Sequence, residues 1–319
     1  MSTVSVLFPQ QPTDVKELLP FGRLVQQSSA RRLWMGQSLR IESHPAFAYL
    51  AGTGCQIPVG LSVGLMALRH PFDAALQARS LAALMDNPVT IGYGAADPNF
   101  VRGLYGAPYE APAAAVEEYV TVARGLLTGE QIVHQGRLFT VDQFLPPMSH
   151  PPVEIGAGVL RPAMARAAGR SADAAITWLT PTGYLRDTLN PMIATAAATA
   201  GRAAPRVVTV VHVAVDRPGR SPMLLAQHGC GNHLRAPHYT DMLRKAGLDV
   251  HASDPIAGAR ELVEENVYVY GSVSEVGAAI RAHFDAGVDE VILNSTAVSN
   301  LHGTDAALAD LSDILTDFR

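Results

Sequence analysis

The amino-acid sequence predicts one (β/α)8 barrel over residues 1–319, and three observations lead to this fold class. Short runs rich in β-branched residues alternate with longer helical patterns along the whole chain. Each short run is mostly apolar without polar alternation, as in parallel strands that are buried on both faces. About eight such β-α units in a chain of this length is the number that a barrel requires. A doubly wound sheet, which usually has fewer strands, is the alternative.

The predicted elements follow one another without an internal repeat. We expect strands at residues 4–8, 32–36, 58–65, 89–94, 153–156, 174–179, 207–215 and 290–294. We expect helices near 13–28, 43–51, 71–85, 112–128, 162–170, 181–200, 221–246 and 273–286. Thr180 and Asp254 each precede a proline, the order typical of a helix cap followed by the first helical residue. Ser272 and Glu275 have the spacing of a capping box.

Two stretches do not fit a minimal barrel. Residues 129–152 read as a hairpin or extended insertion that ends in prolines. Residues 216–270 contain a polar, histidine-rich segment, then a helix and the run VYVYG. Because the loops after barrel strands form the active-site face, we expect this extra length to handle substrate.

Composition excludes several classes of function. The formal net charge is −5 and there is no run of Lys or Arg, which argues against nucleic acid as a partner. Two distant cysteines, Cys55 and Cys230, suit a reduced cytoplasm better than a disulfide framework. The N-terminus reads as a strand rather than a signal peptide, and apolar runs are too short to span a bilayer, so we expect a cytoplasmic protein without a membrane partner.

The turn at Gly156, Ala157 and Gly158 is the first candidate site. A strand end followed by small residues and a helix N-terminus offers free backbone N–H groups to an anion, and Arg161 could add a positive charge. The alternative is that these glycines only allow the backbone conformation of a tight β-α turn. A dinucleotide fingerprint fails here, because Arg161 stands where its third glycine would be.

Other candidates lie at predicted strand ends. Gly94 would let a flat ring approach the backbone, and Asp97 could act as an acid or hydrogen-bond partner, although Asp-Pro-Asn is also ordinary turn chemistry. Gln37 and Ser38 follow the second strand, where barrel sites assemble.

Histidines provide the remaining candidates. Ser62 and Gly64 interrupt the apolar third strand and suggest a bulge, after which Arg69 and His70 precede a helix. We favour a capping role for His70 over a catalytic one. His228, Cys230, His233 and His238 match no standard zinc pattern, and the Gly and Pro among them suggest a loop that lines the substrate site. No metal is therefore expected. Because obvious nucleophiles and bases are few, a cofactor is expected to carry the chemistry.

Four blocks of sequence resemble the bacterial-luciferase-like superfamily of flavin- and deazaflavin-dependent oxidoreductases. They are VGLSVGLMALRHPFDAALQARSLAAL, IGYGAADPNFVRGLYGAPYEAPAAAVEEYVTVARGLLTGE followed by HQGRLFTV, PPVEIGAGVLRPAMARAAGRSADAAITWLTP, and YGSVSEVGAAIRAHFDAGVDEVIL. The resemblance covers nearly the whole chain, and the fold that it implies is a (β/α)8 barrel with insertions.

The resemblance also implies roles for residues. A non-prolyl cis peptide would support the cofactor ring at Ser62–Val63, and the loop after strand four matches Gly94 to Asp97. The implied cofactor-binding residues are Gln37, Ser38, Ser62, Val63, Gly94, Asp97, Gly156, Ala157, Gly158, Val159, Arg161, Thr177 and Thr180, and the implied substrate contacts are Arg69, His70, His228 and His233.

The cofactor implied by the resemblance is F420, with FMN as the alternative. The segments around LWMGQSLRIESHPAFAYLAG and ITWLTP are similar to F420-dependent members, in particular to reductases that hydrogenate dehydroamino acids in lanthipeptide biosynthesis. The family's sugar-phosphate dehydrogenases have an Asp-His pair where Gln37-Ser38 stands here, so the base for alcohol oxidation is absent.

We therefore expect hydride transfer to an activated double bond, with a proton from Asp97, Tyr105 or water. The expected partners are a small-molecule or peptide substrate and a second copy of the chain. A monooxygenase that uses reduced FMN and oxygen is the alternative, and a non-catalytic cofactor-binding barrel is a more distant one.

Overall fold

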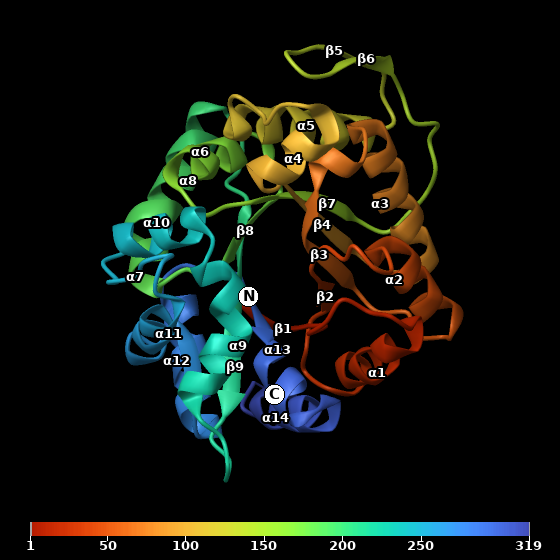
Figure 1. Ribbon diagram of the computed structural model, residues 1–319. Helices are drawn as coiled ribbons and strands as arrows, with labels where there is room; N and C mark the ends of the chain where they lie inside the picture. The colour runs from red at the N-terminus through yellow and green to blue at the C-terminus, as the bar shows by residue number, and fades with distance from the viewer. Residues whose placement is uncertain (1, 319) are drawn as a thin grey trace.

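The computed structural model describes residues 2–318, and its centre is a closed barrel of eight parallel strands (Figure 1). Neighbouring strands pair in chain order, β8 pairs with β9, and β11 pairs with β1 to close the ring. The barrel strands are β1 (Thr3–Leu7), β2 (Leu33–Met35), β3 (Val59–Leu65), β4 (Val89–Gly94), β7 (Val153–Gly158), β8 (Ala174–Trp178), β9 (Arg206–Val215) and β11 (Glu290–Asn294). The predicted fold class and all eight predicted strands are confirmed.

Helices form the outer ring of the barrel (Figure 1). They are α1 (Leu19–Gln27), α2 (Ser43–Gly52), α3 (Pro71–Met85), α5 (Pro112–Leu126), α6 (Pro162–Ser171), α8 (Asn190–Thr199), α12 (Val273–Asp285) and α14 (Thr304–Thr316). Shorter helices lie in the loops after strands, namely α4 (Pro98–Tyr105), α7 (Thr182–Tyr184) and α13 (Thr296–His302). Short 3-10 helices cover Val15–Leu18 and Met66–Leu68, and a π-helical turn covers Leu185–Leu189.

The predicted insertion at residues 129–152 contains an antiparallel hairpin, β5 (Ile132–Gln135) and β6 (Thr140–Gln143). It projects from the ring of helices at the top of Figure 1. The Glu118 carboxylate on α5 accepts hydrogen bonds from the backbone N–H groups of Leu138 (3.1 Å) and Phe139 (2.7 Å). The turn of the hairpin is therefore tied to α5 by a partly buried carboxylate.

The histidine-rich segment is helical, which corrects the predicted loop. α9 (Pro222–Leu234) includes His228 and His233, and α10 (Pro237–Lys245) begins after a break at Ala236. Gly229 lies inside α9 and allows this helix to pack closely on the barrel. A Cβ at this position would lie 3.1 Å from Nδ1 of His212. After α11 (Pro255–Glu264), the run VYVYG forms β10 (Tyr268–Gly271), which pairs in parallel with the last four residues of β9.

The helix caps predicted from sequence have mixed outcomes. Asp254 caps α11 by accepting from Ala257 N–H, and Ser272 and Glu275 form a complete capping box at α12. Thr180 does not cap a helix, because its hydroxyl donates to the Trp178 carbonyl at 3.2 Å and α7 begins two residues later. The preceding residue, Leu179, has φ of 53°, and this left-handed turn separates the strand from the helix.

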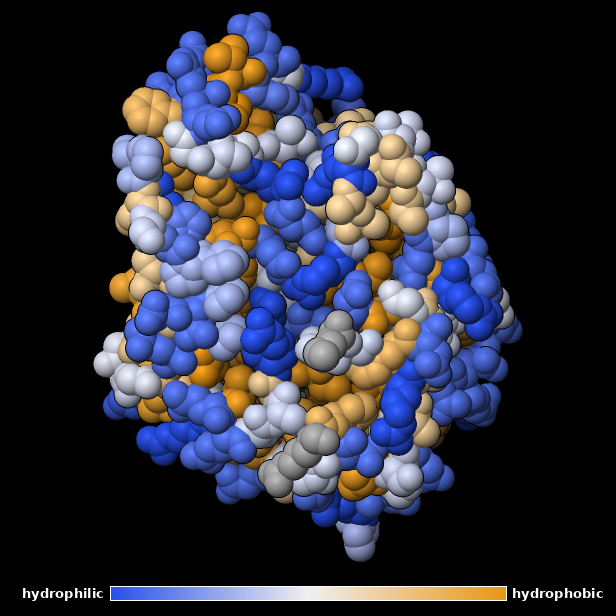
Figure 2. All heavy atoms as spheres, turned by 180° about the vertical axis from the view of Figure 1, so that it is seen from behind, coloured by the Kyte–Doolittle hydropathy of each residue, from blue (hydrophilic) through white to orange (hydrophobic). Residues whose placement is uncertain are grey.

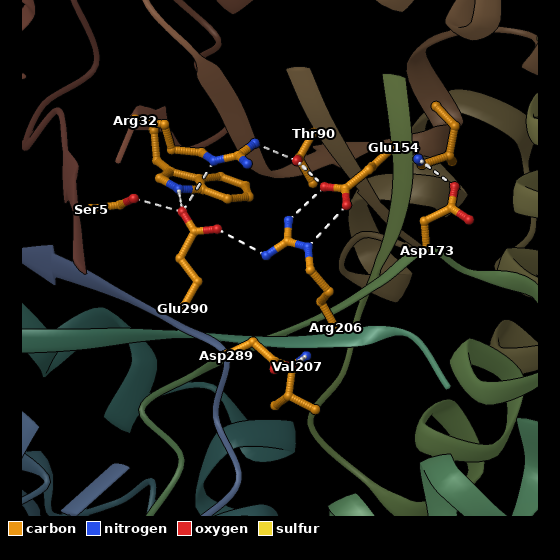
Figure 3. A network of polar contacts seen from close by, with 11 residues as sticks. Ser5, Arg32, Thr90, Glu154, Asp173, Arg206, Val207, Asp289 and Glu290 are labelled. Carbon is orange, nitrogen blue, oxygen red and sulfur yellow. Dashed lines mark hydrogen bonds and ion pairs between the residues drawn. The ribbon is translucent and has the colours of Figure 1, made fainter. Parts of the chain in front are cut away.

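The barrel interior is polar at the amino ends of the strands and apolar above them. Figure 3 shows the polar layer, in which Glu290 and Glu154 alternate with Arg32 and Arg206. Above it, Leu7, Trp34, Ala174, Ile176, Val208, Val210 and Ile292 form one buried cluster. The charged layer therefore lies at the end of the barrel opposite the loops where barrel active sites assemble.

The face of the molecule opposite to Figure 1 is mostly hydrophilic. On the side opposite to Figure 1, hydrophilic residues predominate and hydrophobic ones appear in small groups between them (Figure 2). In residues 2–318 no helix combines the length and the hydrophobicity needed to cross a bilayer.

Candidate functional site

The carboxyl ends of the strands form a mouth above the apolar interior. Strand residues alternate between two faces, so the positions that follow the interior cluster along each strand also face inward. These positions are Gly36, Val63, Gly94, Gly158, Trp178, His212 and Asn294, and we call this set the barrel mouth. Val63 and Trp178 are only partly buried and pack on the interior cluster. The mouth therefore combines an apolar floor with a few polar groups.

Val63 lies at the centre of this floor. The pairing of β3 with β4 shifts between Leu61 and Gly64, and the Ser62–Val63 peptide bond is cis, as the resemblance implied. A Cβ on Gly94 or on Gly158 would lie 3.1 Å from the Val63 side chain. These two glycines therefore leave Val63 room between β4 and β7, and the three residues together offer a smooth apolar bed.

The polar residues predicted after β2 lie beside this bed but are engaged with backbone. The Gln37 side chain accepts from Leu65 N–H at 3.0 Å and donates to the Ser38 carbonyl at 2.7 Å. The buried Ser38 hydroxyl accepts from Arg40 N–H at 3.1 Å. The Ser62 hydroxyl is buried and reaches the Met35 carbonyl at 3.5 Å. Gln37 thus joins the end of β2 to the end of β3.

The loop between β7 and α6 has the features predicted for an anion site. The N-cap residue of α6 is Arg161, and no side chain of the described residues 2–318 caps this helix by accepting from its first-turn N–H groups. The Arg161 side chain is half exposed and lies 3.4 Å from the Asp241 carboxylate of α10. Gly158 faces the mouth, whereas Ala157 and Val159 are buried in the core between barrel and helices. Gly156 is lower in the barrel, against Ala174 and Ile176.

Two predicted threonines are buried away from the mouth. The Thr177 hydroxyl donates to Thr209 Oγ1 at 2.8 Å, between β8 and β9. Thr180 is also buried and is occupied by the turn after β8. Both hydroxyls therefore donate hydrogen bonds within the end of the barrel wall at β8.

A cluster of aromatic and imidazole rings lines the mouth beside β8 and β9. Nε2 of His212 lies 3.3 Å from both Trp178 Nε1 and Asn294 Nδ2. The His212 ring stacks on Tyr268 at 6.0 Å, and His233 lies 5.6 Å from Trp178. Burial, and next to it the charge of His233, lower the pKa of His212 to about 3. This side of the mouth is therefore uncharged at neutral pH.

Sequence reasoning missed three of these residues. Trp178 is the penultimate residue of the predicted strand 174–179, Asn294 ends the predicted strand 290–294, and His212 is the one imidazole in the apolar run RVVTVVHVAV. A polar residue at the end of a barrel strand is a signal of a site, and it could have identified His212 and Asn294.

A comparison with protein-family models decides the family. Residues 2–290 match the model described as luciferase-like monooxygenase. The chain belongs to this luciferase-like family. The protein is accordingly an oxidoreductase of the luciferase-like class. No curated protein sequence matches it.

Solved structures of luciferase-like enzymes share the fold at low sequence identity. An F420-dependent secondary alcohol dehydrogenase in complex with an F420-acetone adduct is 14% identical, with a TM-score of 0.79 over 100% of this chain and 99% of that one. The coenzyme F420 dependent tetrahydromethanopterin reductase from Methanopyrus kandleri is 16% identical, with a TM-score of 0.70 over 99% and 97%. The oxygenating constituent of 3,6-diketocamphane monooxygenase from Pseudomonas putida, in complex with FMN, is 15% identical, with a TM-score of 0.70 over 99% and 98%.

The two predicted proton donors of this luciferase-like chain are both engaged elsewhere. Asp97 is exposed and caps α4, where its carboxylate accepts from Asn99 N–H at 2.8 Å. The Tyr105 hydroxyl donates to the Ala67 carbonyl, and its side chain is 62% exposed. The structure therefore holds Asp97 as a capping residue and Tyr105 outside the mouth.

Arg69, His70 and Tyr105 line a separate cavity of about 530 Å³ beside the mouth, which we call the side cavity. Arg69 donates to Glu42 at 2.9 Å and to Gln77 at 2.7 Å. Burial opposes ionisation of Glu42, but His44 and Arg69 outweigh it and lower the pKa of that carboxyl to about 2. His70 caps α3, as expected, by accepting from Phe72 N–H at 3.2 Å.

The two α9 histidines that were predicted as substrate contacts, His228 and His233, have different surroundings. His233 reaches the mouth, whereas His228 is exposed. Among residues 2–318 no group of three or more His, Cys, Asp or Glu side chains has the arrangement of a metal site.

Proposed function

We propose that this protein is a reductase that uses reduced F420 to hydrogenate an activated carbon–carbon double bond. A dehydroamino acid within a peptide, such as dehydroalanine, is the substrate class that we favour. The observation that carries the proposal is the barrel mouth, which offers a flat apolar bed at Val63 and lacks an ionised base at the end of β2.

The mouth fits a deazaflavin ring and its phosphate. Gly94 and Gly158 present no side chains beside Val63, so a flat ring has room to lie on this bed. The uncapped N-terminus of α6 supplies backbone N–H groups and a positive dipole end for a phosphate, and Arg161 adds a partly exposed cation. Two of the solved luciferase-like structures have F420 in their descriptions, which supports this choice.

Residues at the end of β2 favour reduction over alcohol oxidation. Oxidation of an alcohol requires a base that accepts the hydroxyl proton. The side chain at the expected position is Gln37, an amide whose hydrogen bonds go to Leu65 and Ser38. His212 is held neutral and already accepts hydrogen bonds at Nε2.

The chemistry divides between cofactor and chain. When bound, reduced F420 supplies a hydride for the β-carbon, while a proton is added to the α-carbon, so that the double bond becomes single and F420 is oxidised. Val63 and the neighbouring glycines would orient the ring, and Trp178, His212 and His233 would exclude bulk water on the opposite side. Because Asp97 and Tyr105 are engaged elsewhere, water is the remaining one of the three predicted proton sources.

A monooxygenase that uses reduced FMN and oxygen is the second candidate. The FMN complex among the solved structures and the description of the family favour it. The same bed and helix N-terminus would serve FMN, so geometry alone does not separate the two cofactors.

Titration with each cofactor tests the proposal. We expect the protein to bind F420 more tightly than FMN, and to oxidise reduced F420 without oxygen when a dehydroalanine peptide is present. Reduced F420 is followed by its absorbance and the peptide by a mass increase of two hydrogens. Turnover only with reduced FMN and oxygen would establish the second candidate instead.

The substitution Gly158→Val tests the proposed bed. Even its Cβ would lie 3.1 Å from Val63, so the added methyl groups would project over the bed. We expect F420 affinity to fall at least tenfold, about 1.4 kcal/mol, while the fold is retained. Gly52→Val is the control, because no atom lies within 4 Å of a Cβ at that exposed position. Unchanged affinity in Gly158→Val would refute the assignment.

A further inference from the structure

The side cavity is large enough to hold part of a ligand and is mostly apolar. Its volume of about 530 Å³ is within the range of small-molecule sites. Met66, Val101, Tyr109, Ala114, Leu138 and Phe139 are among its lining residues. Phe139 packs edge-to-face on Tyr119 at 5.7 Å and on His70 at 5.5 Å, which fixes the wall on the hairpin side.

The charged side chains around the side cavity already have partners. Arg69 pairs with Glu42 and is 8% exposed, and Arg137 pairs with Glu110. The Glu118 carboxylate accepts from the hairpin backbone. Because each charge is compensated within the protein, the side cavity favours an uncharged apolar group over the anionic tail of a cofactor.

Hydrophobic side chains also surround the opening on the α4 and hairpin side. Tyr105 is 62% exposed on α4, and Leu138 is 43% exposed in the turn of the hairpin, and both line the side cavity. Exposed apolar residues that gather around a cavity are typical of a binding surface. A ligand larger than the side cavity would therefore continue over this rim.

The side cavity lies within reach of the barrel mouth along β3. Val63 belongs to the mouth, and Met66, the first residue after β3, lines the side cavity. Two extended residues lie between them, so they are about 10 Å apart along the chain. An extended peptide covers the same distance in three residues. We propose that the side cavity binds an apolar or aromatic side chain of a peptide substrate, three residues from the position that is reduced. This inference rests on the proposed reductase function and adds a preference for an apolar residue at one position of its peptide substrate.

Peptide binding tests the inference without turnover. The probes are fluorescently labelled heptapeptides with one central dehydroalanine, which have phenylalanine three residues before it, three residues after it, or serine at both positions. With oxidised F420 present, we expect one phenylalanine peptide to bind at least tenfold more tightly than the serine peptide, as measured by fluorescence anisotropy.

A matched pair of variants locates the binding. Ala114→Phe places a ring in the side cavity, whereas Ala113→Phe adds the same ring to the same helix at a position that does not line it. We expect Ala114→Phe to remove the preference for phenylalanine, and Ala113→Phe to retain it. Equal binding of all three peptides, or equal effects of the two variants, would overturn the inference.

The design separates this inference from the proposed function. If the phenylalanine preference depends on Ala114 but reduced F420 is not oxidised by any of the peptides, the side cavity is a peptide site and the reductase proposal fails. If the peptides are reduced at the same KM whichever residue stands at the third position, the reductase proposal holds and the inference fails.

Discussion

His212 is the residue at the mouth whose environment departs most from water. Its side chain is 1% exposed, its Nε2 faces Trp178 and Asn294, and its Nδ1 has no hydrogen-bond partner among residues 2–318. An imidazolium there would lose hydration without gaining an opposite charge, which explains the low pKa of about 3. The folded protein therefore keeps His212 neutral over the physiological range.

This shift predicts how stability depends on pH. An unfolded histidine binds a proton below its ordinary pKa of about 6.5, while folded His212 does not until about pH 3, so stability falls as the pH drops through this window. Between pH 7.5 and 5.0, we expect His212→Asn to lose about 2 kcal/mol less free energy of unfolding than the wild type. Urea unfolding at both pH values measures the difference. The exposed His228→Asn is the control, and an identical pH response in His212→Asn would contradict the assignment.

Candidate residues were predictable where their backbone position alone defines the role. Gly94 and Gly158 lie at strand ends that the apolar pattern locates, and both reach the mouth, whereas the cis bond at Ser62–Val63 inside β3 was implied only by the family resemblance. Thr177 and Tyr105 were not predictable, because the direction of a side chain depends on register and on neighbours that are distant in sequence. A shift of one residue along β8 exchanges the buried Thr177 for the mouth residue Trp178.

Elements were predictable where their ends carry chemical signals. The capping box of Ser272 and Glu275 forms as expected and begins α12. The two helices α9 and α10 were predicted as one helical range, while the histidines in it were assigned to a loop because of Gly229, Gly231 and Pro237. Only the proline breaks the helix. Gly229 is tolerated because tertiary packing against His212 and Ala297 requires a small residue there.

The capping box allows a prediction for α12. Its Ser272 hydroxyl accepts from Glu275 N–H at 3.3 Å, and Glu275 accepts from Ser272 N–H at 2.8 Å. Ser272→Ala removes one cap, so we expect the free energy of unfolding to fall by about 1 kcal/mol. Ser80→Ala, in the middle of α3, removes a hydroxyl that bonds only within its own helix and should change stability by less than about 0.5 kcal/mol. A larger loss in Ser80→Ala than in Ser272→Ala would count against this account.

At the scale of the whole molecule, the polar layer ties together strands that are far apart in sequence. Glu290 on β11 accepts from Ser5 at 2.6 Å and from Trp34 Nε1 at 2.8 Å, and it pairs with Arg32 and Arg206 (Figure 3). Arg206 also pairs with Glu154 on β7, which accepts from Thr90 on β4. This network spans most of the ring at the end opposite the mouth, so it helps to hold the barrel closed. The ion pairs of the network therefore lie away from the mouth.

Removal of the charge at Glu290 should therefore affect the whole barrel. Glu290→Gln keeps the volume of the side chain but leaves Arg32, whose side chain is 5% exposed, without its carboxylate partner. An unpaired buried charge is costly, so we expect the free energy of unfolding to fall by about 3–5 kcal/mol, as measured by urea denaturation. Arg206 keeps Glu154, so most of this loss should come from Arg32.

The double variant Glu290→Gln with Arg32→Met should then be more stable than Glu290→Gln alone, because the uncompensated cation is gone. The exposed pair of Arg186 and Asp187 is the control, and Asp187→Asn should leave the urea midpoint unchanged. If the double variant is no more stable than the single one, the loss comes from the hydrogen bonds of Ser5 and Trp34 rather than from the charge on Arg32.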